Sequence, residues 1–330
     1  MIKLKVRILI TGAAGSIGAP TLNLLKKKNE VLGIDNFSSY YSVEYKRERV
    51  EYFKLESDVH DLDICDFDKL SRIFLEFKPE VVVHLAARPG VRAPNINLGE
   101  YIDSNIVGFN NMTKLSYNLG ISKFIFASSS SVYSSKNLIP FSEFDTLYYP
   151  KSFYALTKQS NEMIAKSFAS ESTKFLGMRF FTVYGPWGRP DMAIQQFLGK
   201  AIKGVQSKFT SNLMTKRDFT YIDDVTKVIG ESIELKFTNN FQVINVGASS
   251  PRTMKDLFQI MTNLGMDSYF EKYPPSDSDL NFTHASIDNL RKMGFTVPTT
   301  TLEMGVLKTY EWLNSQESQT ALNAILQFKN

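Results

Sequence analysis

The chain has 330 residues, of which 43% are hydrophobic, and a net charge of +4. This length can bury one large core and a smaller second one. The mildly basic charge suits an anionic small molecule and is too small to indicate a nucleic-acid partner. Cys65 is the single cysteine, which excludes an internal disulfide and fits a reducing, cytoplasmic compartment. No apolar run is long enough to span a membrane, and the three histidines lack metal-ligand spacing, so we expect neither a membrane nor a metal site.

A glycine-rich turn follows the first predicted strand. Residues 4–10 are an apolar run typical of a buried parallel strand, and residues 19–28 have the pattern of a helix. Between them lie Gly12, Gly15 and Gly18, with Ser16 and Ile17. A strand, a glycine turn and a helix in this order let the backbone and the positive helix end approach a pyrophosphate. The alternative is a glycine turn that binds nothing.

An acidic residue ends the second predicted strand, residues 30–34. Asp35 follows the glycines at the distance where a carboxylate bonds the adenosine ribose hydroxyls, and Asn36 stands beside it. A carboxylate there would repel a 2′-phosphate, so the sequence favours NAD over NADP. The alternative is that Asp35 only ends the strand.

Strands and helices alternate along the rest of the first half. Strands are predicted at 59–62, 80–87 and 124–127, and helices at 67–77 and 101–119. This alternation predicts an α/β fold with a doubly wound parallel sheet, and ligands bind such sheets at the carboxyl ends of the strands. We expect the basic clusters at 26–28 and 46–47 to lie on solvated helix faces.

Three side chains can carry proton transfer. If residues 152–168 are helical, Tyr154 and Lys158 project from one face. A lysine ammonium beside a phenol lowers the phenol pKa from about 10, which makes Tyr154 a base near neutral pH. Lys158 can also hold the nicotinamide ribose, and Ser129, after the fifth strand, can share the substrate hydroxyl. On its own, this tyrosine–lysine spacing is also typical of an ordinary exposed helix face.

Further blocks carry a family resemblance. They are residues 84–87, 89–92, 104–109, 127–133, 140–143, 154–158, 179–193 (RFFTVYGPWGRPDMA) and 217–224 (RDFTYIDD). With them the chain resembles the extended short-chain dehydrogenases/reductases, NAD-dependent epimerase/dehydratase family, and within it the UDP-glucuronate 4-epimerases. The resemblance runs from residue 6 to about 313, and the block at 179–193 is the most specific.

The resemblance implies a reaction and a set of site residues. Tyr154 takes the proton from the sugar O4 while the C4 hydride moves to NAD, the 4-keto sugar turns over in the pocket, and the hydride returns to its other face. Ser129, Tyr154 and Lys158 would be catalytic. The cofactor site would comprise Gly12, Gly15, Ser16, Ile17, Gly18, Asp35, Asn36, Asp63, Ile64, Leu85, Ala86, Ala87, Asn105, Ala127, Ser128, Tyr154, Lys158, Phe181 and Val183. The substrate site would comprise Pro89, Gly90, Val91, Arg92, Ser129, Ser130, Ser131, Thr182, Arg189 and Arg217, with Arg189 suited to a C6 carboxylate.

Neighbouring functions stay open. A 4,6-dehydratase needs an acid–base pair where Ser130 and Ser131 stand, and a UDP-glucuronate decarboxylase typically has glutamate at the position of Ser131, so both are weakened. UDP-glucose or a UDP-N-acetylhexosamine are alternative substrates of the same chemistry, and a non-catalytic NAD-binding scaffold is a further alternative. The chain departs from the family at Ser16, at 19–20 and at Arg88-Pro89, which lies at the mouth of the sugar site.

The resemblance also implies a domain plan. Residues 1–181 and 222–250 would form the NAD-binding Rossmann domain, and residues 182–221 and 251–313 the nucleotide-sugar-binding domain. The segment 241–247 would return to the main sheet. Helices near 101–119 and 152–169 carry apolar faces that pair with a second copy in this family, so the resemblance implies a homodimer. The alternative is that these faces are only intramolecular core. A tail, residues 314–330, extends past the resemblance, and 321–326 has the pattern of a short amphipathic helix. The biological role implied is the supply of surface polysaccharide precursors.

Overall fold

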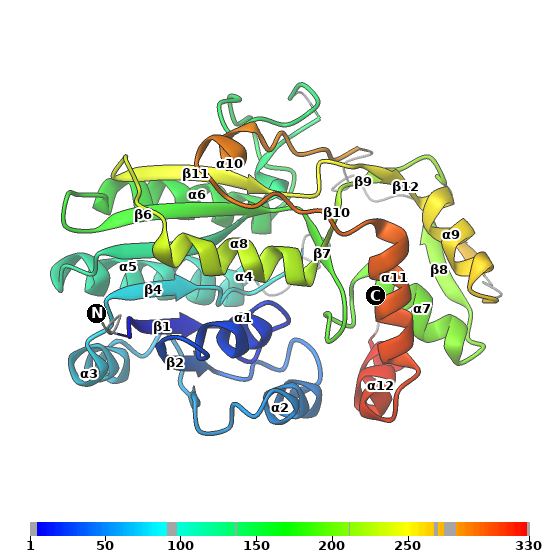
Figure 1. Cartoon of the computed structure of the whole chain (residues 1–330), viewed down its shortest axis with the longest axis horizontal. Helices are drawn as coiled ribbons and strands as arrows, with labels where there is room; N and C mark the ends of the chain where they lie inside the picture. The colour runs from blue at the N-terminus through cyan, green and yellow to red at the C-terminus, as the bar shows by residue number, and fades with distance from the viewer. Residues whose placement is uncertain are drawn as a thin grey trace.

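One seven-stranded sheet forms the centre of the molecule (Figure 1). The computed structural model describes residues 5–90, 98–135, 137–210, 212–266, 270–273 and 282–328. All strand pairs of this sheet are parallel. Across the sheet the strands are β11 (Phe241–Val246), β6 (Lys174–Phe180), β5 (Lys123–Ser129), β4 (Val81–His84), β1 (Arg7–Thr11), β2 (Glu30–Asp35) and β3 (Val59–Asp61). The order reverses between β1 and β4, so the predicted doubly wound parallel sheet is confirmed, including the return of 241–247 to it.

Helices cover both faces of the sheet. On the near face in Figure 1 lie α1 (Gly18–Leu25) and α8 (Ile222–Glu234), and on the far face lie α3 (Phe67–Phe77), α5 (Phe109–Asn118) and α6 (Phe153–Phe168). A hydrophobic core lies on each face of the sheet, and successive side chains of β1 point alternately into one core and the other. Ile8 and Ile10 pack in the core that contains α1 and α8, whereas Leu9 packs in the core that contains α3 and α5.

Strand β4 is shorter than the predicted strand over 80–87. Its ladder stops at His84, and the Leu85 N–H bonds the Thr11 carbonyl. The next N–H, that of Ala86, bonds the Thr11 hydroxyl instead of a main-chain carbonyl. A side chain thus takes over from the backbone of the neighbouring strand, and the chain leaves the sheet as a loop at its carboxyl edge.

The predicted helix over 101–119 is present but uneven. It begins as α4 (Leu98–Tyr101), widens into the π-helix η2 (Ile102–Gly108) and continues as α5. The wide turn carries the buried Asn105, and π-helical turns of this kind are frequent at functional sites.

The remaining elements lie beside and beyond the carboxyl edge of the sheet. They are α2 (Val43–Tyr52), η3 (Ser130–Val132), β7 (Thr182–Tyr184), α7 (Ala193–Ile202), β8 (Ser207–Thr210), β9 (Lys216–Arg217), β10 (Phe219–Tyr221), β12 (Arg252–Thr253), α9 (Met254–Asn263), β13 (Phe270–Tyr273), α10 (Asp288–Lys292), α11 (Leu302–Leu313), η4 (Gln316–Ser318) and α12 (Gln319–Gln327). Three two-stranded sheets join β10 to β7, β12 to β9 and β13 to β8. Helices α7, α9, α11 and α12 share a third hydrophobic core, to which α2 contributes Tyr45.

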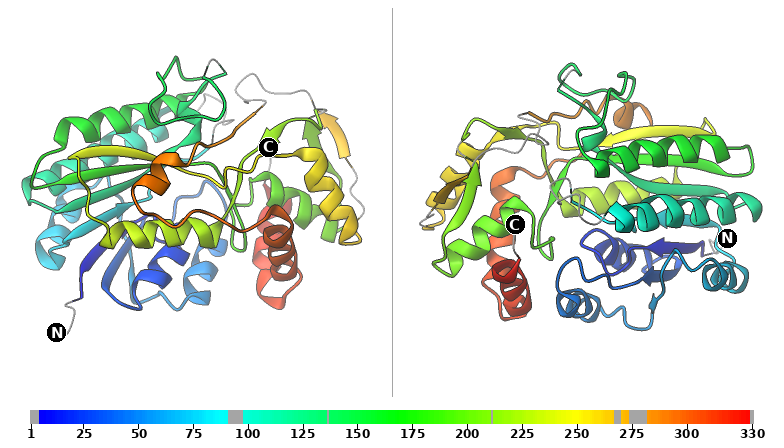
Figure 2. Two further views of the ribbon diagram at one scale, coloured as in Figure 1. Left: turned by 45° about the horizontal axis from the view of Figure 1, so that its top comes forward. Right: turned by 180° about the vertical axis from the view of Figure 1, so that it is seen from behind.

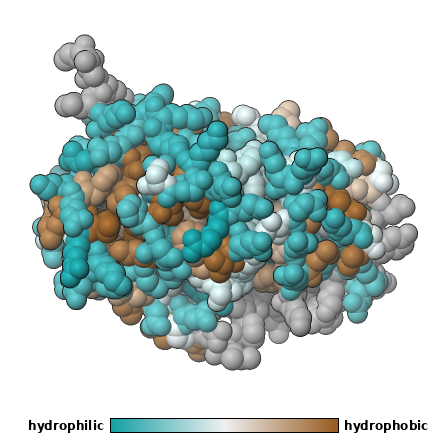
Figure 3. Space-filling view, turned by 90° about the horizontal axis from the view of Figure 1, so that it is seen from below, coloured by the Kyte–Doolittle hydropathy of each residue, from teal (hydrophilic) through white to brown (hydrophobic). Residues whose placement is uncertain are grey.

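Figure 2 shows a second group of elements, formed by α7, β8, β9, β12, α9, β13, α11 and α12, standing apart from the main sheet, with α11 and α12 at its inner side. The predicted helix in the tail is confirmed as α12. The face seen from below in Figure 3 is largely hydrophilic, with brown residues in small separate groups. Within the described ranges, no helix has both the length and the apolar character needed to cross a membrane.

Candidate active site

A cavity of about 1780 Å³ lies at the carboxyl edge of the sheet. Its walls come from the ends of the central strands, from α2, and from the second group of elements. All the predicted site residues that the structure describes line this cavity, except Asn105. Val91 and Arg92 lie outside the described residues. Asn105 stands behind the wall, where its side chain bonds both the N–H and the carbonyl of Arg88 and the Thr157 hydroxyl.

The glycine turn is built for close backbone approach. Gly12 has a φ of 68°, and a Cβ there would lie 2.7 Å from the Ala86 nitrogen. A Cβ on Gly15 or Gly18 would collide with the Gly12 carbonyl oxygen. The turn therefore tolerates only glycine at these positions, and it leads directly into α1, whose N-terminus faces the cavity. This is the geometry that cradles a dinucleotide pyrophosphate.

Asp35 ends β2 beside that turn. Its carboxylate accepts hydrogen bonds from the backbone N–H of Ala14 at 3.0 Å and of Phe37 at 2.8 Å. Burial raises its pKa, while the nearby charge of Lys46 and these hydrogen bonds act the other way. Each carboxylate oxygen keeps a further lone pair, so Asp35 can still accept from a ribose hydroxyl.

The outer end of the cavity is framed by Asp63 and Asn36. The Asn36 amide donates to Asp63 at 2.9 Å, and Asp63 also accepts from the Cys65 N–H at 2.8 Å. Ile64 and Cys65 line the same end. In this sheet topology an adenosine would lie at the tip of β3, where these residues offer one apolar side chain and two fixed polar groups.

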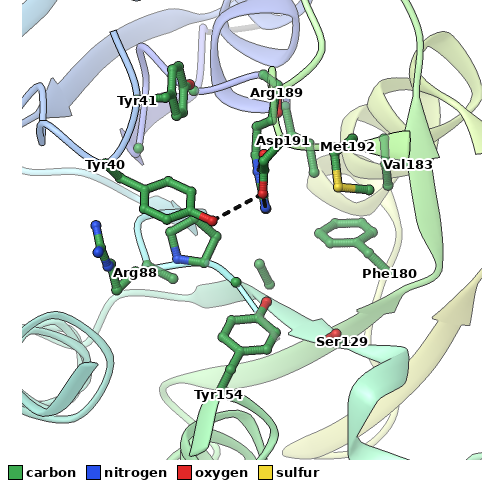
Figure 4. Close-up of a pocket in the computed structure, with 18 of the residues that line it drawn as sticks. Tyr40, Tyr41, Arg88, Ser129, Tyr154, Phe180, Val183, Arg189, Asp191 and Met192 are labelled. Atoms are coloured by element: carbon green, nitrogen blue, oxygen red, sulfur yellow. Dashed lines mark hydrogen bonds and ion pairs between the residues drawn. The ribbon is translucent and has the colours of Figure 1, made fainter. Parts of the chain in front are cut away.

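Tyr154 and Lys158 project from one face of α6, as predicted. Ser152 caps this helix by accepting from the Ala155 N–H at 3.1 Å. The Lys158 ammonium donates to the Ala127 carbonyl at 2.8 Å and lies 5.8 Å from the centre of the Tyr154 ring. Ser129 is the last residue of β5, and its hydroxyl faces the same space as Tyr154 (Figure 4). The three candidate catalytic residues are therefore brought together.

The predicted lowering of the Tyr154 pKa by Lys158 is wrong for this structure. Burial raises the pKa of Tyr154, and the groups that oppose this rise are the Arg189 charge and the Ser129 hydroxyl. Burial likewise lowers the pKa of Lys158 to about 8, against the opposing charge of Glu162. The Lys158 ammonium donates to the Ala127 carbonyl, and the groups that lower the pKa of Tyr154 are Arg189 and Ser129 instead.

Arg189 faces Tyr154 from across the cavity (Figure 4). Its guanidinium makes a two-bonded ion pair with Asp191, at 2.9 and 2.5 Å, and Asp191 also accepts from the Tyr40 hydroxyl at 3.1 Å. The Tyr40 ring lies between two guanidinium groups, 4.3 Å from that of Arg88 and 5.9 Å from that of Arg189. The sequence left the contacts of Arg88 open. In the structure Arg88 stacks on Tyr40 and forms an ion pair with Glu100 at 2.9 Å.

The sequence analysis missed Tyr40, Asp191 and Lys46. Lys46 was expected on a solvated face, and this was wrong: it is buried, lines the cavity, and donates to the Ser38 carbonyl at 2.5 Å. Burial lowers its pKa to about 8, opposed by Asp35. Asp191 lies within the specific block at 179–193, two residues after Arg189, and that spacing is the one local signal that could have found it.

His84, by contrast, is a satisfied strand residue, as the sequence analysis interpreted it. Its Nδ1 lies 2.8 Å from the Thr11 hydroxyl, and its ring packs against Phe109 and Phe124. Within the described residues, no group of three or more histidine, cysteine, aspartate or glutamate side chains is arranged to hold a metal ion.

A glycine cradle, a ribose-binding acid and a tyrosine–lysine pair in one cavity define a Rossmann-type dehydrogenase site, which can exchange a hydride and a proton with an alcohol. The chain belongs to the NAD-dependent epimerase/dehydratase family, whose model matches residues 8–247, and its cofactor is NAD. The cradle and Asp35 fit that cofactor.

Three similar proteins refine this placement. Protein CapI of Staphylococcus aureus is 37% identical, over 93% of this chain and 98% of its own. UDP-glucuronate 4-epimerase 2 of Arabidopsis thaliana is 36% identical, over 93% of this chain and 75% of its own. The crystal structure of UDP-glucuronic acid 4-epimerase from Bacillus cereus, in complex with UDP-glucuronic acid and NAD, superposes with a TM-score of 0.86 at 29% identity, covering 93% of this chain and 99% of that one.

Proposed function

We propose that this protein is an isomerase that inverts C4 of a UDP-sugar, converting UDP-glucuronate to UDP-galacturonate through a transient 4-keto sugar. The single observation that carries the proposal is the position of Arg189 opposite Tyr154 across one cavity. It puts a cation and a proton acceptor on two sides of the space where a hexuronate ring would sit. The similarity to UDP-glucuronate 4-epimerases supports the same substrate.

Bound NAD supplies the site that takes a hydride from C4 and returns it. The residues of this chain do the rest. Tyr154 accepts the proton of the sugar O4 and later gives it back, while Ser129 holds the same oxygen by a hydrogen bond. Lys158, which donates to the Ala127 carbonyl, would bond the nicotinamide ribose. These roles predict that the enzyme consumes no external reductant.

Arg189 is the residue we propose for the C6 carboxylate. Asp191 occupies the edge of the guanidinium that carries Nε, and the other edge keeps N–H groups for a second carboxylate. The Ser131 hydroxyl is buried at the cavity and has no hydrogen-bond partner among the described residues. A buried polar group of this kind is expected to have a partner, which a sugar oxygen would supply. Thr182 and Ser130 line the same part of the cavity.

Holding the carboxylate also protects the reaction. A 4-keto uronate is a β-keto acid. It readily loses CO₂ when the bond from C5 to the carboxylate stands perpendicular to the plane of the C4 carbonyl. Contacts from Arg189 and the hydroxyls would keep the carboxylate out of that geometry. Ser130 and Ser131 offer no charged base, which disfavours dehydration and decarboxylation.

The UDP part would lie among the second group of elements. Arg217 lines that end of the cavity together with Phe209 and Asn212, and we propose it as the diphosphate contact. Pro89 and Gly90 lie at the mouth. We also propose a division into an NAD-binding part (1–181 and 222–250) and a sugar-binding part (182–221 and 251–313). The core shared by α7, α9 and α11 supports this division, although Ala285, Ile287 and Leu290 pack in the core of the main sheet.

We propose a homodimer formed through α5 and α6, which lie side by side on the back of the molecule (Figure 2, right). These helices expose apolar side chains, among them Tyr117, Leu156 and Met163. Light scattering coupled to size-exclusion chromatography tests this; a monomer at micromolar concentration would contradict it. The cytoplasm and a supply of surface polysaccharide precursors are the cellular setting we propose.

The function is tested by an NMR time course of the purified protein with UDP-glucuronate and no added reductant. Growth of UDP-galacturonate to a plateau supports the proposal. Release of CO₂ with a UDP-pentose would establish the decarboxylase instead. Turnover of UDP-glucose or UDP-N-acetylglucosamine alone would keep the chemistry and overturn the substrate.

A further inference from the structure

The loop that carries Arg189 is held in an uncommon backbone shape. Gly185 has a φ of 146° and Trp187 a φ of 59°, a region that side chains other than glycine seldom adopt. Such a conformation persists only where its surroundings over-determine it. Around this loop, Trp187 stacks on Tyr45 with ring centres 5.6 Å apart, and the Tyr45 hydroxyl donates to the Gly188 carbonyl at 2.9 Å.

The C-terminal helix α12 supports the same loop through Gln196. The buried Gln196 amide nitrogen donates to the Pro190 carbonyl, next to Arg189, and to the Ile325 carbonyl of α12 at 3.1 Å. Helices α7 and α12 are unusually close there, because a Cβ on Gly199 would lie 2.8 Å from the Ile325 side chain. One amide thus ties the Arg189 loop to the tail.

The tail reaches Arg189 by a second route, through Tyr40. The Phe328 ring meets the Tyr40 ring edge-on at 5.8 Å, and Tyr40 in turn bonds Asp191, the ion-pair partner of Arg189. Thr320 of α12 donates to Glu48 of α2 at 2.7 Å, which fixes the helix to the sheet side of the cavity. Ala324, Gln327 and Phe328 themselves line the cavity.

We propose that α12 and Phe328 are positioning elements for Arg189, and that they set the affinity for the charged sugar rather than for UDP. This inference rests on the proposed function, since it assigns Arg189 to the carboxylate of the hexuronate. Two contacts from the tail meet at the Arg189–Asp191 pair, one through Gln196 and one through Tyr40. Loss of either contact lets the loop move, so that the Arg189 guanidinium no longer lies where the carboxylate binds. The residues that line the UDP end of the cavity stay in place.

Removal of the whole tail is a poor test, because α12 buries Ala321, Leu322 and Ile325 in the third core. We therefore choose Phe328→Ala and Gln196→Met in the full chain, with Leu326→Ala as the control. Leu326 is an exposed residue of the same helix. The measurements are the Kd values of UDP-glucuronate and of UDP by calorimetry, and KM and kcat for UDP-glucuronate.

The expected result is a two- to tenfold rise in Kd and KM for UDP-glucuronate, about the effect of one hydrogen bond for Gln196→Met and of one aromatic contact for Phe328→Ala. The Kd of UDP should stay unchanged, and Leu326→Ala should match the wild type. An unchanged Kd for UDP-glucuronate in both variants would overturn the inference, and so would an equal weakening of UDP. If the wild-type protein itself neither binds nor converts UDP-glucuronate, the proposed function fails, which separates the two outcomes.

Discussion

The Glu162 carboxylate accepts two hydrogen bonds from the Arg179 guanidinium, at 2.9 and 2.8 Å, and a third from the Ser128 hydroxyl at 2.6 Å. Arg179 also donates to the Tyr133 hydroxyl at 2.8 Å. Glu162 lies one helical turn after Lys158, and Ser128 immediately precedes Ser129. This buried ion pair therefore connects the helix of the proposed base to the strand end of the serines.

Breaking the pair should cost much of the fold's stability. We expect Glu162→Gln to lower the free energy of unfolding by about 3–5 kcal/mol, because it leaves the Arg179 charge buried without a counter-charge. Urea unfolding measures this. Glu76→Gln, on an exposed position of α3, is the control and should stay within about 0.5 kcal/mol of the wild type. Equal losses of unfolding free energy in the two variants would mean that the buried ion pair contributes no more to stability than an exposed carboxylate.

The activity should fall as the pH rises through about 8. Burial lowers the pKa of Lys158 to about 8. The ammonium that we propose to bond the nicotinamide ribose is therefore charged below that pH and neutral above it. The pH profile of kcat/KM is the measurement. Because Glu162 opposes the lowering, Glu162→Gln should move the alkaline limb to lower pH. A limb that stays in place in this variant would show that another group governs it.

Tyr154→Phe should reduce turnover about 10²- to 10⁴-fold, the usual contribution of a positioned acid–base group. NAD binding, measured by calorimetry, should persist, since the change removes one oxygen from a site with many other contacts. Tyr149→Phe, at a tyrosine that is almost fully exposed, is the control. Full turnover by Tyr154→Phe would revive the scaffold hypothesis or move the base elsewhere.

Arg189→Lys tests the carboxylate assignment. Lysine keeps a charge for Asp191 but loses the planar fork, so we expect kcat/KM for UDP-glucuronate to fall about tenfold or more. Turnover of UDP-glucose, if detectable, should change little. Arg291→Lys, in an exposed pair with Asp288, is the matched control. Equal losses on both sugars would place Arg189 at another part of the substrate.

His84→Gln should reduce the loss of stability in mild acid. Burial lowers the pKa of His84 to about 3, below the value of about 6.5 for the unfolded chain. Between these values the unfolded state binds a proton that the folded state does not, so wild-type stability falls by about 2 kcal/mol from pH 7.5 to 5 through this residue. Unfolding at both pH values tests this. His60→Gln, at an exposed position of β3, should retain the wild-type pH dependence.

Short-range patterns in the sequence were enough to predict the cofactor cradle and the candidate catalytic residues. Glycine spacing after a strand, an acid at the next strand end, and a tyrosine and lysine four residues apart on a helix are local features. Each is read from neighbouring residues and backbone geometry, and the structure brings these residues together in one cavity. The alternation of strands and helices likewise predicted the parallel sheet, and the specific block at 179–193 indicated the family.

The pairing and the burial of the charged groups could not be predicted from local patterns. Tyr40 and Asp191 are 151 residues apart, and Gln196 and Ile325 are 129 apart, so no local pattern links them. The pKa of Tyr154 rises rather than falls, and Lys46 is buried rather than solvated, because both depend on what packs around the side chain. Desolvation and long-range pairing arise when distant segments pack, and the order of residues along the chain does not display them.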